Sequence, residues 1–263
     1  MARVTGKTAW IVLVSDFYLA VMEVLVLLAG ILSGGIAAVS GFGIGSILTP
    51  LLAVSFGTKL AVALVAVPHF IGTLVRFIIL RGHLDRKVLL TFGLTSAAGG
   101  IAGALLQIWL RSDALGYVLG GLLIFAGVMG VTRLNQRLRF GRVTGWIAGA
   151  LSGMFGGLVG NQGGIRSAAM MGFEISKESF VATATAIGLL VDLFRMPVYA
   201  ATQFRDIVNA WPMVAVATAG VLVGTFVGKP VLQRIPEQSY RTILSLFILA
   251  LGIWMIAQTT GLV

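Results

Sequence analysis

The chain has 263 residues, of which 58% are hydrophobic and only 11% are charged, and its mean hydropathy is +1.01. This much apolar surface cannot be buried in one soluble core, so the composition excludes a soluble globular protein and predicts an all-α protein that crosses a membrane several times. The formal net charge is +10, but the basic residues lie between apolar segments without a polar domain to carry them, which excludes a nucleic-acid-binding face.

Apolar segments follow one another along the whole chain. In the first half they are 10–40, 44–57, 60–80, 88–110 and 114–132, and in the second half 143–160, 164–173, 179–200, 207–229 and 239–257. We expect one integrated transmembrane domain with about eight membrane segments, of which the first in each half is broken or re-entrant. Residues 1–23 form an N-terminal extension, which is either an interfacial helix or the start of the first helix.

The two halves repeat one another at an offset of 119 residues. This offset places Arg195 over Arg76 and Gly160 over Gly41. The predicted parts are repeat 1 at 24–132, a basic linker at 133–142 and repeat 2 at 143–258. A repeat that keeps glycines and an arginine within a span predicts two pseudo-symmetric halves that close around one anionic ligand.

Lysine and arginine in the loops predict the orientation. The linker 133–142 and the turn 81–87 are both basic and lie two spans apart, so both should face the cytoplasm. The broken segment of the second half then begins and ends on the cytoplasmic side, while that of the first half enters from outside. This is an inverted-topology repeat, which many secondary transporters use to build a substrate site near the membrane midplane.

Two glycine-rich stretches, SGFGIGSILTP (40–50) and GNQGGIRSAA (160–169), predict the helix breaks. Non-helical backbone at membrane depth persists only where protein or a water-filled cavity satisfies its amides. The half-helix after each break would direct its N-terminal amides at the turn and so favour an anion. The alternative is that the glycines serve only close helix packing. The predicted substrate-binding residues are Gly41, Gly43, Gly45, Ser46, Gly160, Asn161, Gln162, Gly163, Gly164, Arg166, Ser167 and Arg195.

Three arginines of the apolar segments are candidates for a role in the site, and their settings differ. Arg76 is five residues before Arg81, so it could take part in gating or could snorkel to the cytoplasmic surface. Arg195 has Asp192 three residues earlier, a helical ion-pair spacing, and is the stronger candidate for an anion contact or a gate. Arg166 follows the second glycine turn and has no arginine counterpart in the first half, so it is a candidate for the main counter-charge of the ligand.

His69 follows Pro68 in the middle of an apolar segment. It is either a proton relay or a hydrogen-bonded structural histidine, and with Arg76 and Asp192 it is a candidate for gating or proton coupling. Carboxylates at depth are too few for a sodium cage. Cysteine is absent, and the chain has no metalloprotease motif and no paired catalytic aspartates, so we predict no enzyme, no catalytic residue, no cofactor and no metal site.

These residues resemble the sulfite exporter TauE/SafE family of membrane permeases. The resemblance rests on LSGGIAAVSGFGIGSILTP and LSGMFGGLVGNQGGIRS, on the four-plus-four layout and on the basic linker, and it covers the chain from residue 24. The usual triple glycine is only partly kept in either copy. The resemblance implies a multi-pass exporter of sulfite, a sulfonate or a related organosulfur anion in the bacterial inner membrane. The expected partners are this small anion and the lipid bilayer, and a homodimer is left open. The alternative functions are an anion channel or a structural subunit of a membrane complex.

Overall fold

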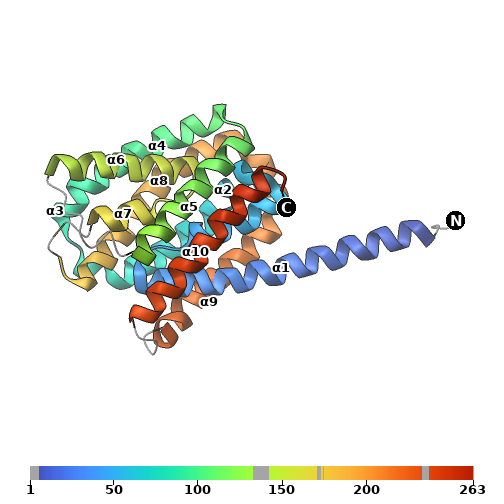
Figure 1. Cartoon of the computed structure of the whole chain (residues 1–263), viewed down its shortest axis with the longest axis horizontal. Coiled ribbons are helices and arrows are strands. Elements are labelled where there is room, and N and C mark those ends of the chain that lie inside the picture. Colours follow the sequence, from blue (N-terminus) through green and yellow to red (C-terminus); the bar gives the residue numbers. More distant parts are fainter. Residues whose placement is uncertain (1–5, 133–141, 171–172, 174, 233–236, 263) are drawn as a thin grey trace.

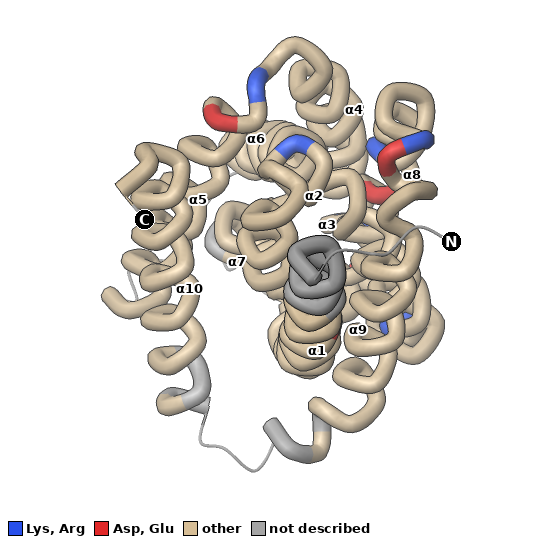
Figure 2. Tube along the Cα trace, turned by 90° about the vertical axis from the view of Figure 1, so that its right-hand side faces the viewer, with Lys and Arg blue, Asp and Glu red and all other residues tan. Residues whose placement is uncertain are grey.

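The computed structural model describes residues 6–132, 142–170, 173, 175–232 and 237–262. Their regular structure is entirely helical, and seven of their helices are long and apolar enough to cross a membrane, with Val143–Val159 as a shorter apolar helix. The helices pack side by side in one bundle (Figure 1). Charged residues occupy little of the Cα trace (Figure 2). The predicted all-α polytopic membrane protein is confirmed.

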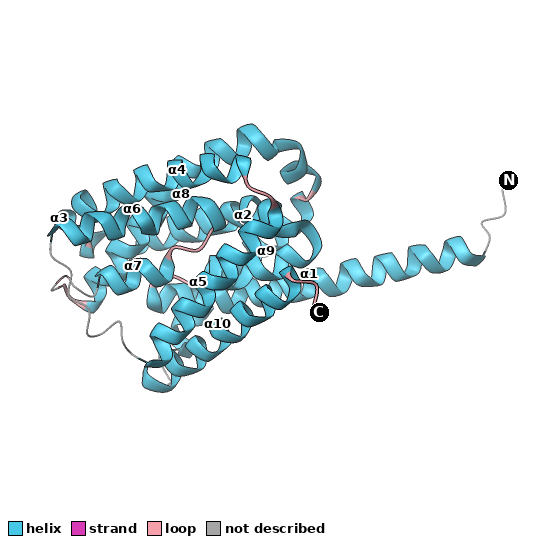
Figure 3. Ribbon diagram, turned by 45° about the horizontal axis from the view of Figure 1, so that its top comes forward, coloured by secondary structure: helices cyan, strands magenta, loops and turns pink. Residues whose placement is uncertain are grey.

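The helices follow the predicted apolar segments closely. The first half contains α1 (Gly6–Ser40), α2 (Ile44–Leu80), α3 (Arg86–Val88), α4 (Leu94–Trp109) and α5 (Ser112–Thr132). The second half contains α6 (Arg142–Val159), α7 (Gly163–Met170), α8 (Lys177–Asn209), α9 (Trp211–Leu232) and α10 (Glu237–Thr259). A 3-10 turn at Arg81–His83 follows α2, and a π-helical stretch at Leu89–Gly93 joins α3 to α4. The described loops between the helices are short (Figure 3).

Two boundaries differ from the expected ones. Helix α8 is assigned up to Asn209 instead of ending near residue 200, but it is kinked at Gln203 (φ −134°, ψ 18°). Beyond this kink Arg205 and Asp206 lie on an exposed helical turn and not in a loop. Helix α1 runs from Gly6 to Ser40 without a break, so residues 8–23 belong to the first helix, which extends beyond the bundle in Figure 1.

Gly57 divides α2 into two parts. Its φ of 70° and ψ of 156° interrupt the helix where the sequence predicts the gap between 44–57 and 60–80. The amide N of Lys59 donates to Ser112 Oγ at the start of α5, at 3.1 Å. The first part of α2 therefore runs from the bundle interior toward the end where α5 begins, and the second part returns.

The closest helix pairs join one half of the chain to the other. They are α1 with α9, α4 with α6, α5 with α10 and α2 with α8. Glycines permit these approaches, since a Cβ atom on Gly30 of α1 would lie 3.0 Å from the carbonyl oxygen of Ala217 in α9. The halves thus interlock in one bundle. Most of the predicted linker, residues 133–141, lies outside the described residues, so the repeat boundaries and the membrane orientation stay predictions.

Candidate functional site

Two short breaks separate consecutive helices inside the bundle. Between α1 and α2 the break covers residues 41–43, and between α6 and α7 it covers residues 160–162. Gly41, Gly43 and Gly160 have φ angles of 78°, 131° and 71°. Side chains other than glycine rarely adopt these angles, so glycine is required to end one helix and start the next within so few residues.

The two breaks pack directly against one another. A Cβ atom on Gly45 would overlap the carbonyl oxygen of Gly160, and Ser46 Oγ donates a hydrogen bond of 3.2 Å to Asn161 Oδ1. All four of these residues are buried. Residues predicted from separate halves of the sequence therefore form one cluster.

Some of the predicted glycines serve packing instead of leaving open space. A Cβ atom on Gly163 would lie 2.6 Å from the Cβ of Phe42. One on Gly164 would lie 2.8 Å from the Cβ of Ala126 in α5. The packing alternative therefore holds for these two positions, whose missing side chains let the second break approach its neighbours.

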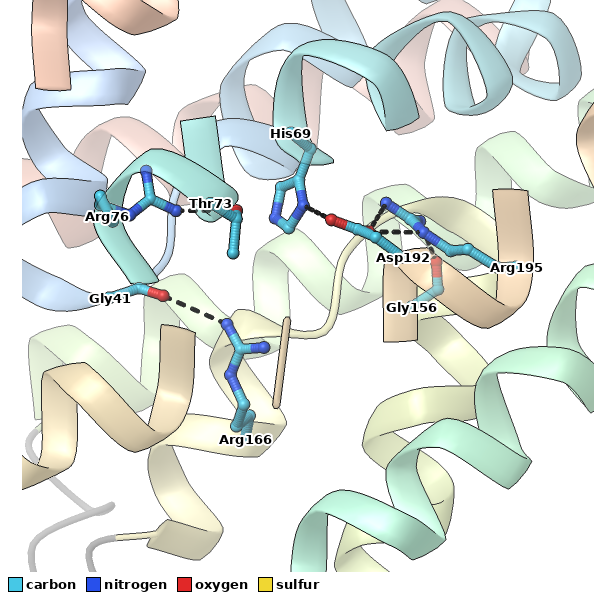
Figure 4. Close-up of polar contacts among 8 residues, drawn as sticks. All are labelled: Gly41, His69, Thr73, Arg76, Gly156, Arg166, Asp192 and Arg195. Atoms are coloured by element: carbon cyan, nitrogen blue, oxygen red, sulfur yellow. Dashed lines mark hydrogen bonds and ion pairs between the residues drawn. The ribbon is translucent and has the colours of Figure 1, made fainter. Parts of the chain in front are cut away.

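Arg195 is fully bonded to the protein. Its Nε donates to Asp192 Oδ1 at 2.9 Å, its Nη2 lies 2.8 Å from the same oxygen, and its Nη1 donates to the carbonyl of Gly156 (Figure 4). The second carboxylate oxygen of Asp192 lies 2.5 Å from His69 Nδ1. Arg195 and Asp192 are 1% and 0% exposed, so this ion pair is sealed from solvent.

The end of α6 explains the third bond of Arg195. Because α6 ends inside the bundle, its last carbonyl groups lack most of their helical partners and can accept from donors elsewhere, although Gly156 O still accepts from the amide N of Gly160 at 3.0 Å. Three side chains supply them: Arg195 to Gly156 O, Tyr199 to Gly157 O, and Gln107 Nε2 to Leu158 O at 3.1 Å. Two of these donors come from α8 and one from α4, so the break in α6 is held in place from both sides.

Arg76 is only partly bonded. Its Nη2 donates to Thr73 Oγ1 at 2.9 Å, but Nε and Nη1 have no hydrogen-bond partner. The side chain is 2% exposed, so the alternative that it snorkels to the surface is wrong. Its route outward is closed because α8 and α9 pack against α2, with Gly72 directly beside Val221.

Arg166 is the second partly bonded arginine. It is 1% exposed, and its Nη2 donates to the carbonyl of Gly41 at 3.2 Å, which joins α7 to the first break. Its Nε and Nη1 have no partner, and its charge is close enough to Arg76 to repel it. Within the part of the chain that the structure describes, no carboxylate lies within ion-pair distance of either arginine. Two buried cations thus lack a directly paired carboxylate, although the charge of Asp192 acts on both from a greater distance.

Two neutral hydrogen-bond donors, in the second break and in α7, also lack partners. Asn161 Nδ2 and Ser167 Oγ are buried and have no hydrogen-bond partner. Gln162 is the exception among the predicted polar residues, because the unpartnered atom of its side chain is the acceptor Oε1, beside Gly156. Its backbone carbonyl accepts from Ser152 Oγ at 3.2 Å.

His69, Thr73 and Arg76 lie on one face of α2, since their spacing is that of successive helical turns. Opposite them, Gly188 of α8 lets side chains from two other helices approach closely. A Cβ atom there would lie 3.1 Å from Arg166 Nη1 and 3.7 Å from both His69 Cε1 and Thr73 Cγ2. The contacts of Gly188 therefore come from α2 and α7, the two helices that carry the partly bonded arginines.

Sequence reasoning missed several residues of this region. Thr73 and Tyr199 carried a detectable signal, because they lie three residues before Arg76 and four after Arg195, on the same helical faces. Gly188 and the carbonyl of Gly156 carried none, since their role depends on how α6, α7 and α8 pack. The pairing of His69 with Asp192 likewise joins two helices and could not be seen in spacing.

Membrane-spanning helices that are interrupted inside the bundle, around buried polar groups, define a membrane transport protein. A search against family models gives a match to the sulfite exporter TauE/SafE family over residues 26–255. This match covers most of the chain, which therefore belongs to the TauE/SafE family, as its sequence motifs predict. No curated protein and no solved structure matches the chain. The protein is a multi-pass membrane transporter from a family of transporters and not of enzymes.

Proposed function

We propose that the protein exports a small anion, namely sulfite, a sulfonate or a related organosulfur anion, across the bacterial inner membrane. The anion binds near the midplane, between the two glycine breaks, with Arg76 and Arg166 as its main contacts. The observation that carries this proposal is that both guanidinium groups are buried and each keeps two nitrogens without a partner.

Electrostatics favours an anionic ligand here. Burying a charge without a direct partner costs several kcal/mol, so two buried arginines without a directly paired carboxylate are unfavourable until an anion joins them. The planar guanidinium group matches the oxygens of a sulfite or sulfonate, to which it can donate two parallel hydrogen bonds. Each charge-assisted bond contributes about 1.5–3 kcal/mol.

Neutral donors suit a transporter because they bind without holding the anion too firmly. Asn161 Nδ2 and Ser167 Oγ can each donate to an oxyanion and add no charge. Arg195 acts indirectly in this proposal. It fixes Asp192 and the end of α6, so it positions the second break and does not contact the anion.

Reconstituted vesicles test the proposal. Purified protein should catalyse saturable exchange of labelled sulfite, sulfate or methanesulfonate across the bilayer. Arg166→Gln and Arg76→Gln should each lower exchange at subsaturating anion by about 10–100-fold, while Arg205→Gln, which changes an exposed arginine on α8, should leave it unchanged. Conductance that does not saturate would indicate an anion channel. Absence of both flux and binding for every anion would favour a structural subunit and contradict the proposal.

A further inference from the structure

We propose that the site selects a doubly charged oxyanion, such as fully ionised sulfite, over singly charged anions of the same size, such as small monosulfonates. This inference rests on the proposed anion site and names the charge class of its ligand. The observations that carry it are the balance of buried charges around Arg76 and Arg166 and the kind of atoms that lack a partner there.

The buried charges of this region do not balance. Arg76, Arg166 and Arg195 are buried, and Asp192 is the buried carboxylate whose charge acts on all three. Arginine keeps its charge in proteins, so three guanidinium groups face one carboxylate and leave an excess of two positive charges. His69, which is bonded to Asp192, can only add to this excess because its imidazole is either neutral or positive.

The excess is located on Arg76 and Arg166. Arg195 binds Asp192 directly, with its Nε 2.9 Å from Oδ1, so these two charges compensate each other. The hydrogen bonds of the other two arginines, of 2.9 Å to a threonine hydroxyl and 3.2 Å to a backbone carbonyl, end on uncharged atoms (Figure 4). Each of these arginines also keeps Nε and Nη1 without a partner, and guanidinium nitrogens can only donate.

Both guanidinium groups belong to one small region of the bundle. At Gly188 of α8, a Cβ atom would lie 3.1 Å from Arg166 Nη1 and 3.7 Å from Thr73 Cγ2. The hydroxyl of Thr73 in turn accepts from Arg76 Nη2 at 2.9 Å. A doubly charged anion that accepts from both groups compensates the whole excess, whereas a singly charged anion leaves one buried positive charge.

Hydration makes this match of charge necessary. The free energy needed to remove an ion from water grows with the square of its charge, while its attraction to fixed cations grows only in proportion to the charge. A site with one excess cation would therefore favour a singly charged anion, which loses its water more easily. Two excess cations whose free nitrogens all donate are what a doubly charged oxyanion requires.

Sulfate and perchlorate provide the first test. Both are tetrahedral, have the same number of oxygens and are similar in size, and neither changes its protonation near neutral pH. Titration calorimetry of the wild-type protein in micelles, at constant ionic strength, should show sulfate binding at least about tenfold more tightly. Hydration alone predicts the reverse order. Perchlorate that binds as tightly as sulfate would overturn the inference.

Variants of Arg166 give the second test. Arg166→Gln removes one excess charge, so sulfate should lose more affinity than perchlorate, and the ratio of the two affinities should fall by about threefold to tenfold. Arg166→Lys keeps the charge but has fewer donors, so it should weaken both anions and leave the ratio near the wild-type value. Equal losses for the two anions in Arg166→Gln would contradict the role of charge.

Sulfite extends the test to the proposed substrate. Its second ionisation lies near neutral pH, so the ratio of sulfite affinity to sulfate affinity should rise with pH through this range and then become constant. Sulfate serves as the control because it stays doubly charged and reports any titration of the protein itself. A ratio that stays flat or falls would show that singly charged hydrogensulfite is bound and would overturn the inference.

The outcomes separate the two proposals. If the wild-type protein binds no anion at all, the anion site and this inference both fail. Binding of sulfate and perchlorate without preference for sulfate would overturn this inference alone. If Arg166→Gln does not fold, the comparison of sulfate with perchlorate on the wild-type protein still decides.

Discussion

Two arginines occupy equivalent places in the halves of this chain, yet their bonding differs. Thr73 and Asp192 are 119 residues apart, as are Arg76 and Arg195, so each arginine has a partner three residues earlier. In α8 the partner is a carboxylate, and Arg195 is completely bonded. In α2 the partner is a hydroxyl, and Arg76 keeps two nitrogens without a bond. One side chain therefore decides whether the arginine supports the protein or can serve a ligand.

The same offset pairs further residues that differ. Gly188 stands where the first half has His69, and Ile47 where the second half has Arg166. The glycine lets the imidazole and Arg166 approach α8 closely, and Arg166 supplies a second cation. A chain with repeated helix breaks thus forms a single asymmetric site, in which α2 and α7 present charge and α8 provides support.

The largest expected effect is a loss of stability when Asp192, the partner of Arg195 in α8, is changed. Asp192→Asn leaves Arg195 buried without a counter-charge, so the free energy of unfolding should fall by about 3–5 kcal/mol. Thr73→Ala removes only one hydrogen bond to Arg76 and should cost about 1 kcal/mol. Denaturant unfolding in mixed micelles measures both. Equal losses would show that the two arginines are not used differently.

Anion affinity should show the reverse order. Arg76→Gln and Arg166→Gln each remove a charge-assisted contact, so affinity should fall by about 10–100-fold, equivalent to about 1.5–3 kcal/mol, with little loss of stability. Arg195→Gln should lower stability instead, because it removes a donor from the end of α6. Titration calorimetry and unfolding of the same samples check this. If only Arg195→Gln lost affinity while still folded, the anion would bind at Arg195 and not at Arg76 and Arg166.

Thr73→Asp converts the first half to the pattern of the second. The new carboxylate can pair with Arg76, so the ligand-free protein should become more stable while anion affinity falls about tenfold. Thr73→Asn has a similar size without the charge and serves as the control. Thermal unfolding with and without sulfate measures both effects. If Thr73→Asp binds the anion as well as Thr73→Asn does, Arg76 is not a contact.

The smallest expected effect concerns the end of α6. Tyr199→Phe removes the hydroxyl that donates to the carbonyl of Gly157 and keeps the ring, so it should cost about 1 kcal/mol of stability. Anion affinity should stay at the wild-type value because Tyr199 supports the break from outside the site. Unfolding and binding measurements on this variant would contradict the division of roles if affinity fell and stability did not.

Local sequence features were enough to predict the helix breaks and most helix ends. The expected segment 143–160 matches α6 (Arg142–Val159), and 88–110 ends next to Trp109, because apolar length and glycine clusters act through neighbouring residues. The ion pair of Arg195 and Asp192 followed from helical spacing in the same way. The end of α8 was missed because polar residues beyond 200 suggested a loop.

Ranking the arginines required the tertiary structure. Arg76 is near Arg81 in the sequence, which suggested a route to the surface, but packing of α8 and α9 against α2 closes it. Sequence spacing favoured Arg195 as the anion contact because Asp192 lies near it. In the structure Asp192 binds Arg195, so its donors are already used. The pairing of His69 with Asp192 depends on how two helices face one another, which spacing within one helix does not reveal.

The most direct test of the account is a structure of the protein with bound selenate, located by the anomalous scattering of selenium. We predict a single selenium peak between the guanidinium groups of Arg76 and Arg166, next to Gly188, with the bonds between Arg195 and Asp192 unchanged. A peak in contact with Arg195 and a displaced Asp192 would contradict the account. So would a fully bound selenate that touches neither Arg76 nor Arg166.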